Sequence, residues 1–432
     1  MGVSTALLTD HYELTMLAAA LGSGTGERRC VFEAFARRLP TGRRYGVVGG
    51  TARVVEAISE FRFGDDELRH LREHRVVDED TIAWLADYRF AGDVDGYAEG
   101  ELYFPGSPIL TVTGTFADAV VLETLVLSIL NHDSAIVSAA ARMAGAANGR
   151  PIIEMGSRRT HEHAAVASAR AAYLAGFATT SNLESGRTFG IPTAGTCAHA
   201  FTLLHDSERA AFEAQVAALG TGTTLLVDTY DITRGIATAV EVAGTGLGAI
   251  RIDSGDVGVL ARQAREQLDG LGARDTRIVV SGDLDEYAIA ALRAEPVDAY
   301  GVGTSVVTGS GAPTAGMVYK LVEVDGRPVE KRSSHKESRG GRKLALRTHK
   351  PTGTALEEVV YLERGVAPEL GEHDRLLQIP LLRGGRPVAG LPTLEDSRNR
   401  VRQGLVSLPW EGLKLSAGEP AIPTVYPVQE QA

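Results

Sequence analysis

The stretch that decides the fold is GAIRIDSGDVGVLARQAREQLDGLGARDTRIVVSGD, residues 248–283. It begins with a short apolar run, GAIRIDS, continues with an amphipathic helical segment, DVGVLARQAREQLDGLG, and ends with a second apolar run, TRIVVSG. Short apolar runs separated by a helical segment are typical of parallel strands that are joined by a crossover helix. The stretch therefore predicts a βαβ unit whose strands are buried on both faces.

The same alternation extends from about residue 150 to residue 305. The other apolar runs are RPIIEM, AGFATTS, IPTAGTCA, TTLLVDT and AYGVGTS, and Ala-rich helical segments such as HEHAAVASARAAYLAG lie between most of them. Seven strands with crossover helices call for parallel pairing with both faces covered, and a closed α/β barrel provides this. The run MVYKLVEVDG could supply a further strand.

The two ends of the chain have a different character. Residues 1–125 mix helical segments, strand-like runs and turns such as FPGSP, and residues 335–432 contain loops, short strands and one helical segment, TLEDSRNRVRQGLVSL. We expect these two segments to form one mixed domain, and residues 126–334 to form the barrel domain.

Composition excludes several classes of function. The net charge of -11 argues against general binding to nucleic acid or to an anionic membrane. Only two cysteines are present, so neither a disulfide framework nor a cysteine-based zinc site is expected, which favours the cytoplasm. The first lysine is Lys320, which rules out a Schiff-base lysine and a Walker-type phosphate loop in the preceding residues.

Polar residues follow nearly every predicted strand of the barrel. Catalytic groups in such barrels lie at the carboxyl ends of the strands, so these residues predict an active site there. They are Arg158 and Arg159, Ser181 and Asn182, His199, Asp228 and Asp231, Arg251, Asp253 and Asp256, Asp283, and the Gly-Thr-Ser loop 303–305.

The aspartates fall into two groups. Asp231, Asp256 and Asp285 immediately precede helical segments and are predicted to be N-caps. Asp228 and Asp253 lie within strand endings, where an unpaired carboxylate is costly, and they are predicted to have partners and a function.

Two further features indicate anion binding. The backbone amides of GVGTS can hold a phosphate without lysine, although small residues also serve tight turns. Arg158 and Arg159 would point to opposite sides of an extended segment, so that one of them can grip a carboxylate or phosphate in the barrel mouth.

His199 ends the apolar stretch GIPTAGTCAH and has three interpretations. It could be a packed core histidine, or half of a dyad with Cys197, since residues i and i+2 share a strand face. The interpretation we favour pairs it with Asp228 on the next strand ending, which leaves the other ring nitrogen nucleophilic. Asp253 and Asp283 could hold Mg²⁺ and a polyphosphate nearby, a setting in which a histidine can accept a phosphoryl group.

The ordered motifs TDHYELTM, FARRLP, EMGSRRTH, GTCAH, LLVDTYD, IRIDSGD, GVGTSVVT, YKLVEVDG and PTLEDSR resemble those of nicotinate phosphoribosyltransferases, essentially from end to end. The resemblance implies a type II phosphoribosyltransferase with an irregular, TIM-like α/β barrel and a mixed α/β domain built from both chain ends. It implies a homodimer with shared active sites. The implied reaction joins nicotinate to phosphoribosyl pyrophosphate for NAD salvage, with Mg²⁺ and with ATP as co-substrate, and makes this a ligase-type enzyme.

The resemblance also implies roles for individual residues. His199 matches the histidine that becomes phosphorylated, and Asp228 the carboxylate that orients it. Tyr12 matches an aromatic that stacks on the pyridine ring across the dimer. The implied substrate contacts are Asp10, Arg158, Ser181, Arg251 and Asp253, and the implied phosphate contacts are Gly282, Asp283, Gly301, Gly303, Thr304, Arg37 and Lys336.

Departures from the family pattern and rival functions concern mainly the ring pocket. Met155 stands where relatives often have an aromatic, and its sulfur is a partial substitute against a ring. The nicotinamide-using relative has an aspartate where this chain has Ser181, which favours a carboxylate ligand here. Quinolinate phosphoribosyltransferase generally offers a lysine-rich pocket, which the late Lys320 argues against. A non-catalytic, nucleotide-sensing paralogue is the remaining alternative.

Overall fold

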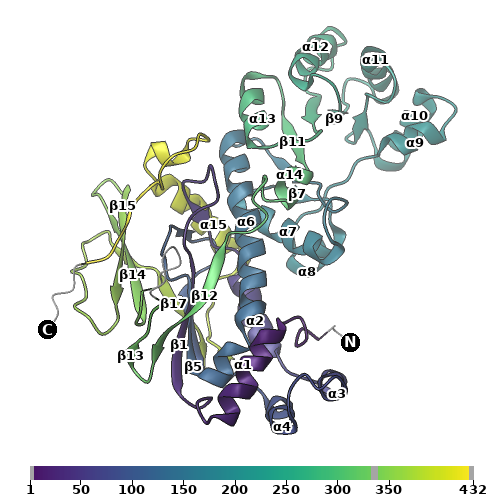
Figure 1. Ribbon diagram of the computed structural model, residues 1–432. Coiled ribbons are helices and arrows are strands. Elements are labelled where there is room, and N and C mark those ends of the chain that lie inside the picture. Colours follow the sequence, from purple (N-terminus) through teal and green to yellow (C-terminus); the bar gives the residue numbers. More distant parts are fainter. Residues whose placement is uncertain (1–3, 332–338, 428–432) are drawn as a thin grey trace. The chain divides into compact units, whose positions relative to one another are not determined.

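The computed structural model describes residues 4–331 and 339–427. By its internal contacts the chain divides into two compact units (Figure 1). The first unit comprises Met1–Ser138 and Thr314–Ala432, and the second comprises Ala139–Pro313. Both ends of the chain thus belong to the first unit.

The first unit is built on antiparallel sheets. Its largest sheet in the described residues has the order β13-β12-β1-β5-β3-β17-β18, with β13 Arg327–Pro328, β12 Met317–Val324, β1 Arg29–Ala36, β5 Leu110–Thr115, β3 Asp93–Tyr97, β17 Gln378–Arg383 and β18 Arg386–Pro387. A second sheet is β16 Arg375–Leu376, β14 Lys343–His349, β15 Ala355–Leu362 and β19 Thr424–Val425, and a small one pairs β2 Gly46–Val47 with β4 Leu102–Tyr103. The predicted strand MVYKLVEVDG is therefore β12, and it pairs with β1 in this unit.

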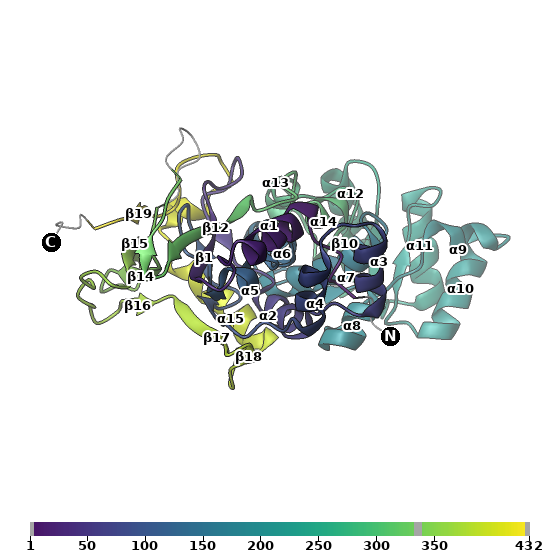
Figure 2. The ribbon, with the colours of Figure 1, turned by 60° about the horizontal axis from the view of Figure 1, so that its bottom comes forward.

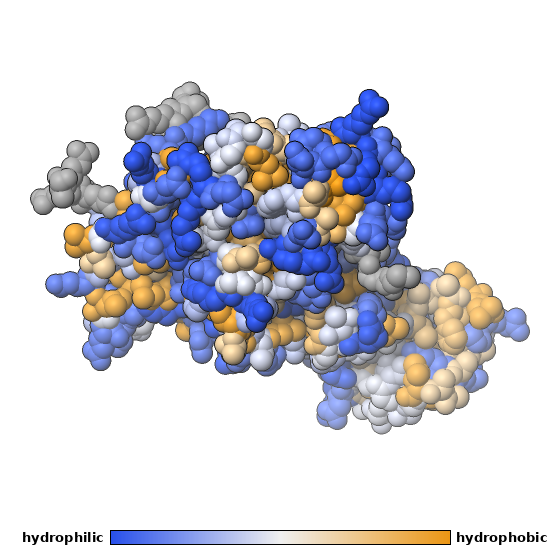
Figure 3. Space-filling view, turned by 90° about the horizontal axis from the view of Figure 1, so that it is seen from below, coloured by the Kyte–Doolittle hydropathy of each residue, from blue (hydrophilic) through white to orange (hydrophobic). Residues whose placement is uncertain are grey.

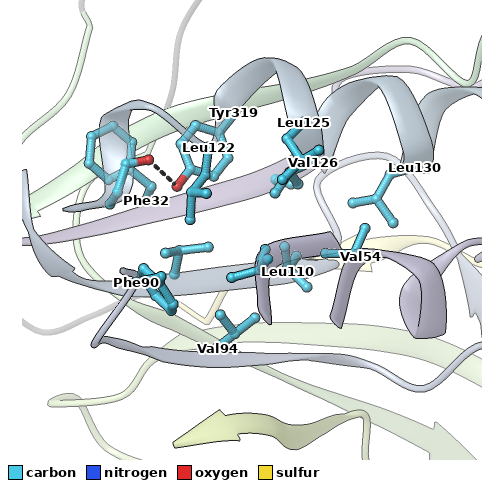
Figure 4. Packing of buried hydrophobic residues seen from close by; sticks show 14 of the residues in the cluster. Phe32, Val54, Phe90, Val94, Leu110, Leu122, Leu125, Val126, Leu130 and Tyr319 are labelled. Atoms are coloured by element: carbon cyan, nitrogen blue, oxygen red, sulfur yellow. Dashed lines mark hydrogen bonds between the residues drawn. The ribbon is translucent and has the colours of Figure 1, made fainter. Parts of the chain in front are cut away.

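The helices of the first unit are α1 His11–Gly22, α2 Thr51–Glu60, α3 Asp65–Glu73, α4 Glu79–Asp87, α5 Phe116–Val120, α15 Leu394–Ser407 and the 3-10 turn η2 Trp410–Leu413. The long helix α6, Glu123–Ala147, begins in this unit and ends in the second. In Figure 4, Leu125, Val126 and Leu130 of α6 lie over Phe32 and Leu110 of the large sheet, in one buried apolar cluster. This burial removes apolar surface from water and is the main stabilisation of the unit.

One segment of the described chain, Phe116–Ala147, is long and apolar enough to cross a membrane by length and composition alone. Its apolar stretch is mostly buried against the rest of the protein, which is the pattern of a core helix. The apolar residues of α6 are thus accounted for by packing within the protein.

The second unit carries the predicted parallel sheet. Its order is β7-β6-β11-β10-β9-β8, with β7 Thr179–Thr180, β6 Ile152–Glu154, β11 Ala299–Val302, β10 Arg277–Val280, β9 Ala249–Ile252 and β8 Thr224–Leu226. All neighbouring strands are parallel. The βαβ unit predicted over residues 248–283 is confirmed as β9, α12 and β10.

The helices of the second unit are α7 Glu162–Ala175, α8 Leu183–Phe189, α9 His199–Leu204, α10 Glu208–Leu219, α11 Ile232–Ala243, α12 Val257–Gly270, α13 Glu286–Ala291, the 3-10 turn η1 Leu292–Ala294 and α14 Thr304–Val307. Helices α9 to α12 pack side by side in chain order (Figure 2). The N-cap predictions are confirmed, since the side chains of Asp231, Asp256 and Asp285 each accept hydrogen bonds from the backbone of the following helix.

The sequence prediction of a third barrel strand at IPTAGTCA is wrong. This segment makes a single parallel bridge, between Thr180 and Thr193, and most of its residues are exposed or half-buried. Pro192 lacks an N–H group, and prolines and glycines within a run interrupt strand pairing. The described sheet is consequently an open half-barrel, with β7 and β8 as its edges.

Candidate functional site

The carboxyl ends of β8, β9 and β10 bring together four of the predicted site residues. These strands are parallel neighbours, so their carboxyl ends lie at the same edge of the sheet. Asp228 follows β8, Arg251 and Asp253 lie at the end of β9, and His199 begins α9. Hydrogen bonds and close contacts connect them, which makes this edge the candidate site.

His199 is not a packed core residue, and its two ring nitrogens lie next to Asp228 and Thr229. Its side chain is 39% exposed, and its Nδ1 lies 3.1 Å from the Thr229 hydroxyl. Its Nε2 lies 3.8 Å from Asp228 Oδ1. Burial raises the pKa of the Cys197 thiol, which disfavours the thiolate form. Both ring nitrogens thus face residues that follow β8.

Asp228 presents a buried, uncompensated oxygen to this histidine. The carboxylate is 1% exposed, and its Oδ2 accepts hydrogen bonds from the Asp253 N–H at 2.9 Å and the Ser254 hydroxyl at 2.7 Å. Within the described part of the chain, Oδ1 has no hydrogen-bond partner. The distance of 3.8 Å from Asp228 Oδ1 to His199 Nε2 is too long for a hydrogen bond. A buried acceptor without a hydrogen-bond partner is nevertheless costly in free energy. An N–H group on that face of the ring would direct a donor toward this acceptor.

Arg251 connects three segments of the site. Its guanidinium donates to Ser281 Oγ at 2.8 Å, to Thr196 Oγ1 at 3.1 Å and to Asp253 Oδ1 at 2.5 Å. Ser281 follows β10, Thr196 lies in the segment that precedes His199, and Asp253 follows β9. The planar fork of arginine suits such multiple contacts, so Arg251 is held in one orientation.

Asp253 is kept ionised by its neighbours. Burial by itself would raise the pKa of this carboxyl, but the hydrogen bond from Ser281 and the charge of Arg251 outweigh burial, and the pKa is lowered. A negative charge is thus available at the carboxyl end of β9.

One of the two predicted phosphate loops, the one after β10, has a backbone that requires glycine. Gly282 has φ of 106°, and a Cβ there would lie 2.4 Å from the Asp253 carbonyl oxygen. The next residue, Asp283, has φ of 46°. At Gly301 a Cβ would meet the sulfur of Met155 at 2.9 Å. Gly303 is the N-cap of α14 and Thr304 is its first residue, so the backbone N–H groups of a helix N-terminus follow β11.

The end of β6 differs from its prediction. Arg158 and Arg159 lie in an exposed turn, closed by a hydrogen bond from the Arg159 N–H to the Gly156 carbonyl, and the extended segment predicted for them is wrong. A glycine is needed at position 156 for close packing, because a Cβ there would meet Val307 and the Gly303 carbonyl. Ser181 follows the neighbouring β7 and donates its N–H to the Glu154 carbonyl at 2.8 Å.

Several contributing residues carried no sequence signal. Thr196, Thr229 and Ser281 contact His199 or Arg251 through hydroxyl groups. Glu154 is a buried carboxylate that accepts from the Thr180 hydroxyl at 2.6 Å and from the Gly156 N–H, and burial raises its pKa against these hydrogen bonds. Thr196, Thr229 and Ser281 lie inside or beside motifs named above, but threonine and serine are common in loops and form no pattern of their own.

The remaining predicted residues belong to the first unit or fall outside the described residues. Tyr12 is in α1 and 45% exposed, and Asp10 precedes that helix. Burial raises the pKa of the Tyr12 hydroxyl, and the nearby Glu123 carboxylate raises it further. Arg37 follows β1, and its Nε is buried without a hydrogen-bond partner in the described residues. Lys336 lies outside the described residues.

Comparisons with known proteins agree with the motifs. Residues 7–131 match the family model of the nicotinate phosphoribosyltransferase (NAPRTase) N-terminal domain. Nicotinate phosphoribosyltransferase pncB1 of Mycobacterium tuberculosis (strain ATCC 25618 / H37Rv) is 66% identical over 426 residues, which cover 97% of this chain and 94% of that protein. The chain belongs to the nicotinate phosphoribosyltransferase family. The family resemblance drawn from the motifs is thereby confirmed.

More distant members of the nicotinate phosphoribosyltransferase family extend the likeness. The nicotinate phosphoribosyltransferase of Bacillus subtilis (strain 168) is 38% identical over 76% of this chain and 69% of that protein. The crystal structure of human nicotinic acid phosphoribosyltransferase superposes with a TM-score of 0.83 at 26% identity, covering 97% of both chains. Fold and sequence therefore point to the same family.

Proposed function

We propose that this chain is an enzyme that joins nicotinate to phosphoribosyl pyrophosphate, giving nicotinate mononucleotide and pyrophosphate, with ATP hydrolysis coupled through a phosphoryl group on His199. In the main reaction the bond from the ribose anomeric carbon to pyrophosphate breaks and its electrons leave with pyrophosphate. The pyridine nitrogen then forms the new bond to that carbon. The reaction follows from the family to which the chain belongs.

One observation supports the role proposed for His199 as the phosphoryl acceptor. A solvent-accessible imidazole has one nitrogen facing the buried, unpartnered Oδ1 of Asp228, at an edge that also holds Arg251 and Asp253. Phosphorylation at the other nitrogen would leave a cationic ring, and the charge of Asp228 would stabilise it. This geometry supports ATP as the co-substrate.

The other residues of the edge suit the sugar and its phosphates. Loss of pyrophosphate leaves positive charge on the ribose, and the ionised Asp253 would stabilise that charge. The N–H groups after β10 and β11 would bind the phosphate of the ribose, near Gly282, Asp283, Gly301, Gly303 and Thr304. We place the ring near Ser181 and Arg158, where the arginine would pair with the nicotinate carboxylate.

Magnesium fits this site only together with a substrate. In the chain from residue 4 to 331 and from 339 to 427, no group of three or more His, Cys, Asp or Glu side chains gathers to hold a metal ion. Mg²⁺ commonly binds through one or two carboxylates plus substrate phosphates, and Asp253 and Asp283 would be those carboxylates. Bound Mg²⁺ would neutralise charge on the departing pyrophosphate.

We also propose a cytoplasmic homodimer with shared active sites, in which Tyr12 of one protomer would stack on the ring bound by the other. Apolar surface gathers at the end of the second unit where α9 and α10 lie, at the right of Figure 3. Leu203, Leu204 and Leu219 of these helices are each more than half exposed. Exposed apolar groups of this kind are typical of surfaces that bind another protein.

Mononucleotide formation by the purified full-length chain tests the proposed reaction. The protein would receive phosphoribosyl pyrophosphate and Mg²⁺ with nicotinate or nicotinamide, each with and without ATP, and nucleotide and ADP would be quantified by chromatography. We expect product from nicotinate, more of it with ATP, and matching ADP release. Product from nicotinamide alone would overturn the assignment of the ring pocket, and no product from either base would favour a nucleotide-sensing role.

Replacing Arg251 with lysine should lower kcat/KM about 10- to 100-fold. The reason is that a lysine ammonium cannot contact Ser281, Thr196 and Asp253 at the same time, so charge-assisted hydrogen bonds are lost. The matched control is Arg262→Lys, at an exposed arginine of α12 paired with Glu295. Steady-state kinetics of both variants measure the difference. Equal values for the two variants would show that the fork of Arg251 is not required.

A further inference from the structure

The two nitrogens of the His199 ring face two consecutive residues. Asp228 and Thr229 follow β8, and the first lies 3.8 Å from Nε2 while the second lies 3.1 Å from Nδ1. The distance from Nδ1 to the threonine hydroxyl is that of a hydrogen bond, whereas the distance from Nε2 to the carboxylate is not. The ring is therefore held through Thr229 in this structure.

Hydrogen-bond chemistry then decides which nitrogen carries the proton. An ionised carboxylate only accepts hydrogen bonds, so a neutral ring that faces Asp228 favourably must carry its proton on Nε2. Nδ1 then has the lone pair, and it can accept a hydrogen bond from the Thr229 hydroxyl, which is able to donate. The two residues favour the same tautomer from opposite sides of the ring.

We propose that Thr229 is a positioning residue for phosphoryl transfer to His199. Its hydroxyl holds the lone pair of Nδ1 in place in the resting protein and donates to a phosphoryl oxygen once Nδ1 carries the phosphoryl group. In that step the Nδ1 lone pair forms the bond to the terminal phosphorus of ATP, and the bond from that phosphorus to the bridging oxygen breaks, its electrons leaving with ADP. Nε2 keeps its proton, and the charge gained by the ring faces Asp228. This inference rests on the proposed function.

The surroundings of Thr229 are consistent with a role at the ring. Asp231, two residues later, is the N-cap of α11, which fixes the chain after Thr229. Asp228, immediately before it, is anchored by the Asp253 N–H and the Ser254 hydroxyl. Thr229 is thus fixed on both sides, and its hydroxyl is directed at Nδ1.

The test compares Thr229→Val, which keeps the shape and removes the hydroxyl, with Thr229→Ser, which keeps the hydroxyl. Phosphohistidine would be measured as acid-labile label from [γ-³²P]ATP on the full-length protein. The tautomer of His199 would be read from ¹⁵N chemical shifts of ¹⁵N-histidine-labelled protein without ligand, assigned with His199→Ala. We expect about three- to tenfold less phosphohistidine and a loss of the Nε2–H tautomer preference for Thr229→Val, and values near wild type for Thr229→Ser.

The outcomes separate this inference from the function on which it rests. Wild-type amounts of phosphohistidine and an unchanged tautomer in Thr229→Val would overturn the role of Thr229 and leave ATP coupling in place. An absence of phosphohistidine on the wild-type protein would instead overturn the ATP coupling, and the inference with it. If Thr229→Val does not fold, Thr229→Ala removes the same hydroxyl without adding a methyl group, and the same two readouts apply.

Discussion

Replacing His199 with alanine is expected to abolish the stimulation of mononucleotide formation by ATP, while a slower, ATP-independent reaction remains. The reason is that the imidazole facing Asp228 is the group that would accept the phosphoryl group, whereas Arg251, Asp253 and the glycine loops that would bind the other substrate remain intact. The ratio of rates with and without ATP should therefore fall to about one, since the covalent route is removed.

The measurement is the initial rate with nicotinate and phosphoribosyl pyrophosphate at several ATP concentrations. His373→Ala is a matched control, because this histidine is exposed in a loop of the first unit. That variant should keep the ATP stimulation of the wild type. Unchanged stimulation in His199→Ala would remove this histidine from the mechanism, and an equal loss in both variants would indicate a general defect.

The second large effect is a loss of stability that is expected when a buried ion network of the first unit is broken. Arg347 in β14 is 1% exposed, and its guanidinium contacts Glu101 Oε1 and Glu358 Oε2 at 2.6 Å each. It also donates to the Leu102 carbonyl at 2.8 Å, and Tyr97 donates to Glu358 at 2.7 Å. Removing one partner of a buried ion pair leaves an uncompensated charge, which costs about 3–5 kcal/mol.

Arg347→Met should accordingly lower the free energy of unfolding of this unit by about 3–5 kcal/mol. Both tryptophans, Trp84 and Trp410, belong to the first unit, so tryptophan fluorescence during denaturant unfolding reports on it alone. Arg69→Met, at an exposed arginine paired with Asp66 on α3, should leave the free energy of unfolding close to the wild-type value.

A variant with Arg347→Met, Glu101→Gln and Glu358→Gln tests the cause of that loss. Because it removes the buried charges together, it should recover part of the stability lost in Arg347→Met. No recovery would show that lost packing, and not uncompensated charge, accounts for the effect. A similar loss in Arg69→Met and Arg347→Met would contradict the importance of burial.

The same buried ion network makes the stability of the first unit depend on pH. Burial would raise the pKa of Glu101, but the charges of Arg347 and Arg375 outweigh it and lower the pKa from 4.5 to about 2. A carboxyl whose pKa is lower in the folded state stabilises the protein above its unfolded pKa. Its contribution should therefore be complete above about pH 4.5 and be lost as the pH falls toward 2. In Arg347→Met this loss should begin at a higher pH.

Much of the second unit could be predicted from the sequence because the signals were local. Apolar runs separated by amphipathic segments predicted β9, α12 and β10, and aspartates ahead of helices predicted three N-caps. The two wrong predictions, a strand at IPTAGTCA and an extended segment at Arg158, also have local causes. Pro192 interrupts strand pairing after β7, and a turn closed by the Arg159 N–H and the Gly156 carbonyl replaces the extended segment expected for Arg158.

The sequence by itself determined the family, the parallel sheet and the residues gathered at its carboxyl edge, because motif order, periodicity and residue chemistry are properties of the chain alone. Only the tertiary structure decided that the described sheet is open, that Arg251 joins three segments, and that Thr229 and Asp228 face opposite nitrogens of His199. These contacts join residues as much as 55 positions apart, so they depend on how neighbouring strands and loops are aligned. A common residue such as threonine gains its role only from that alignment.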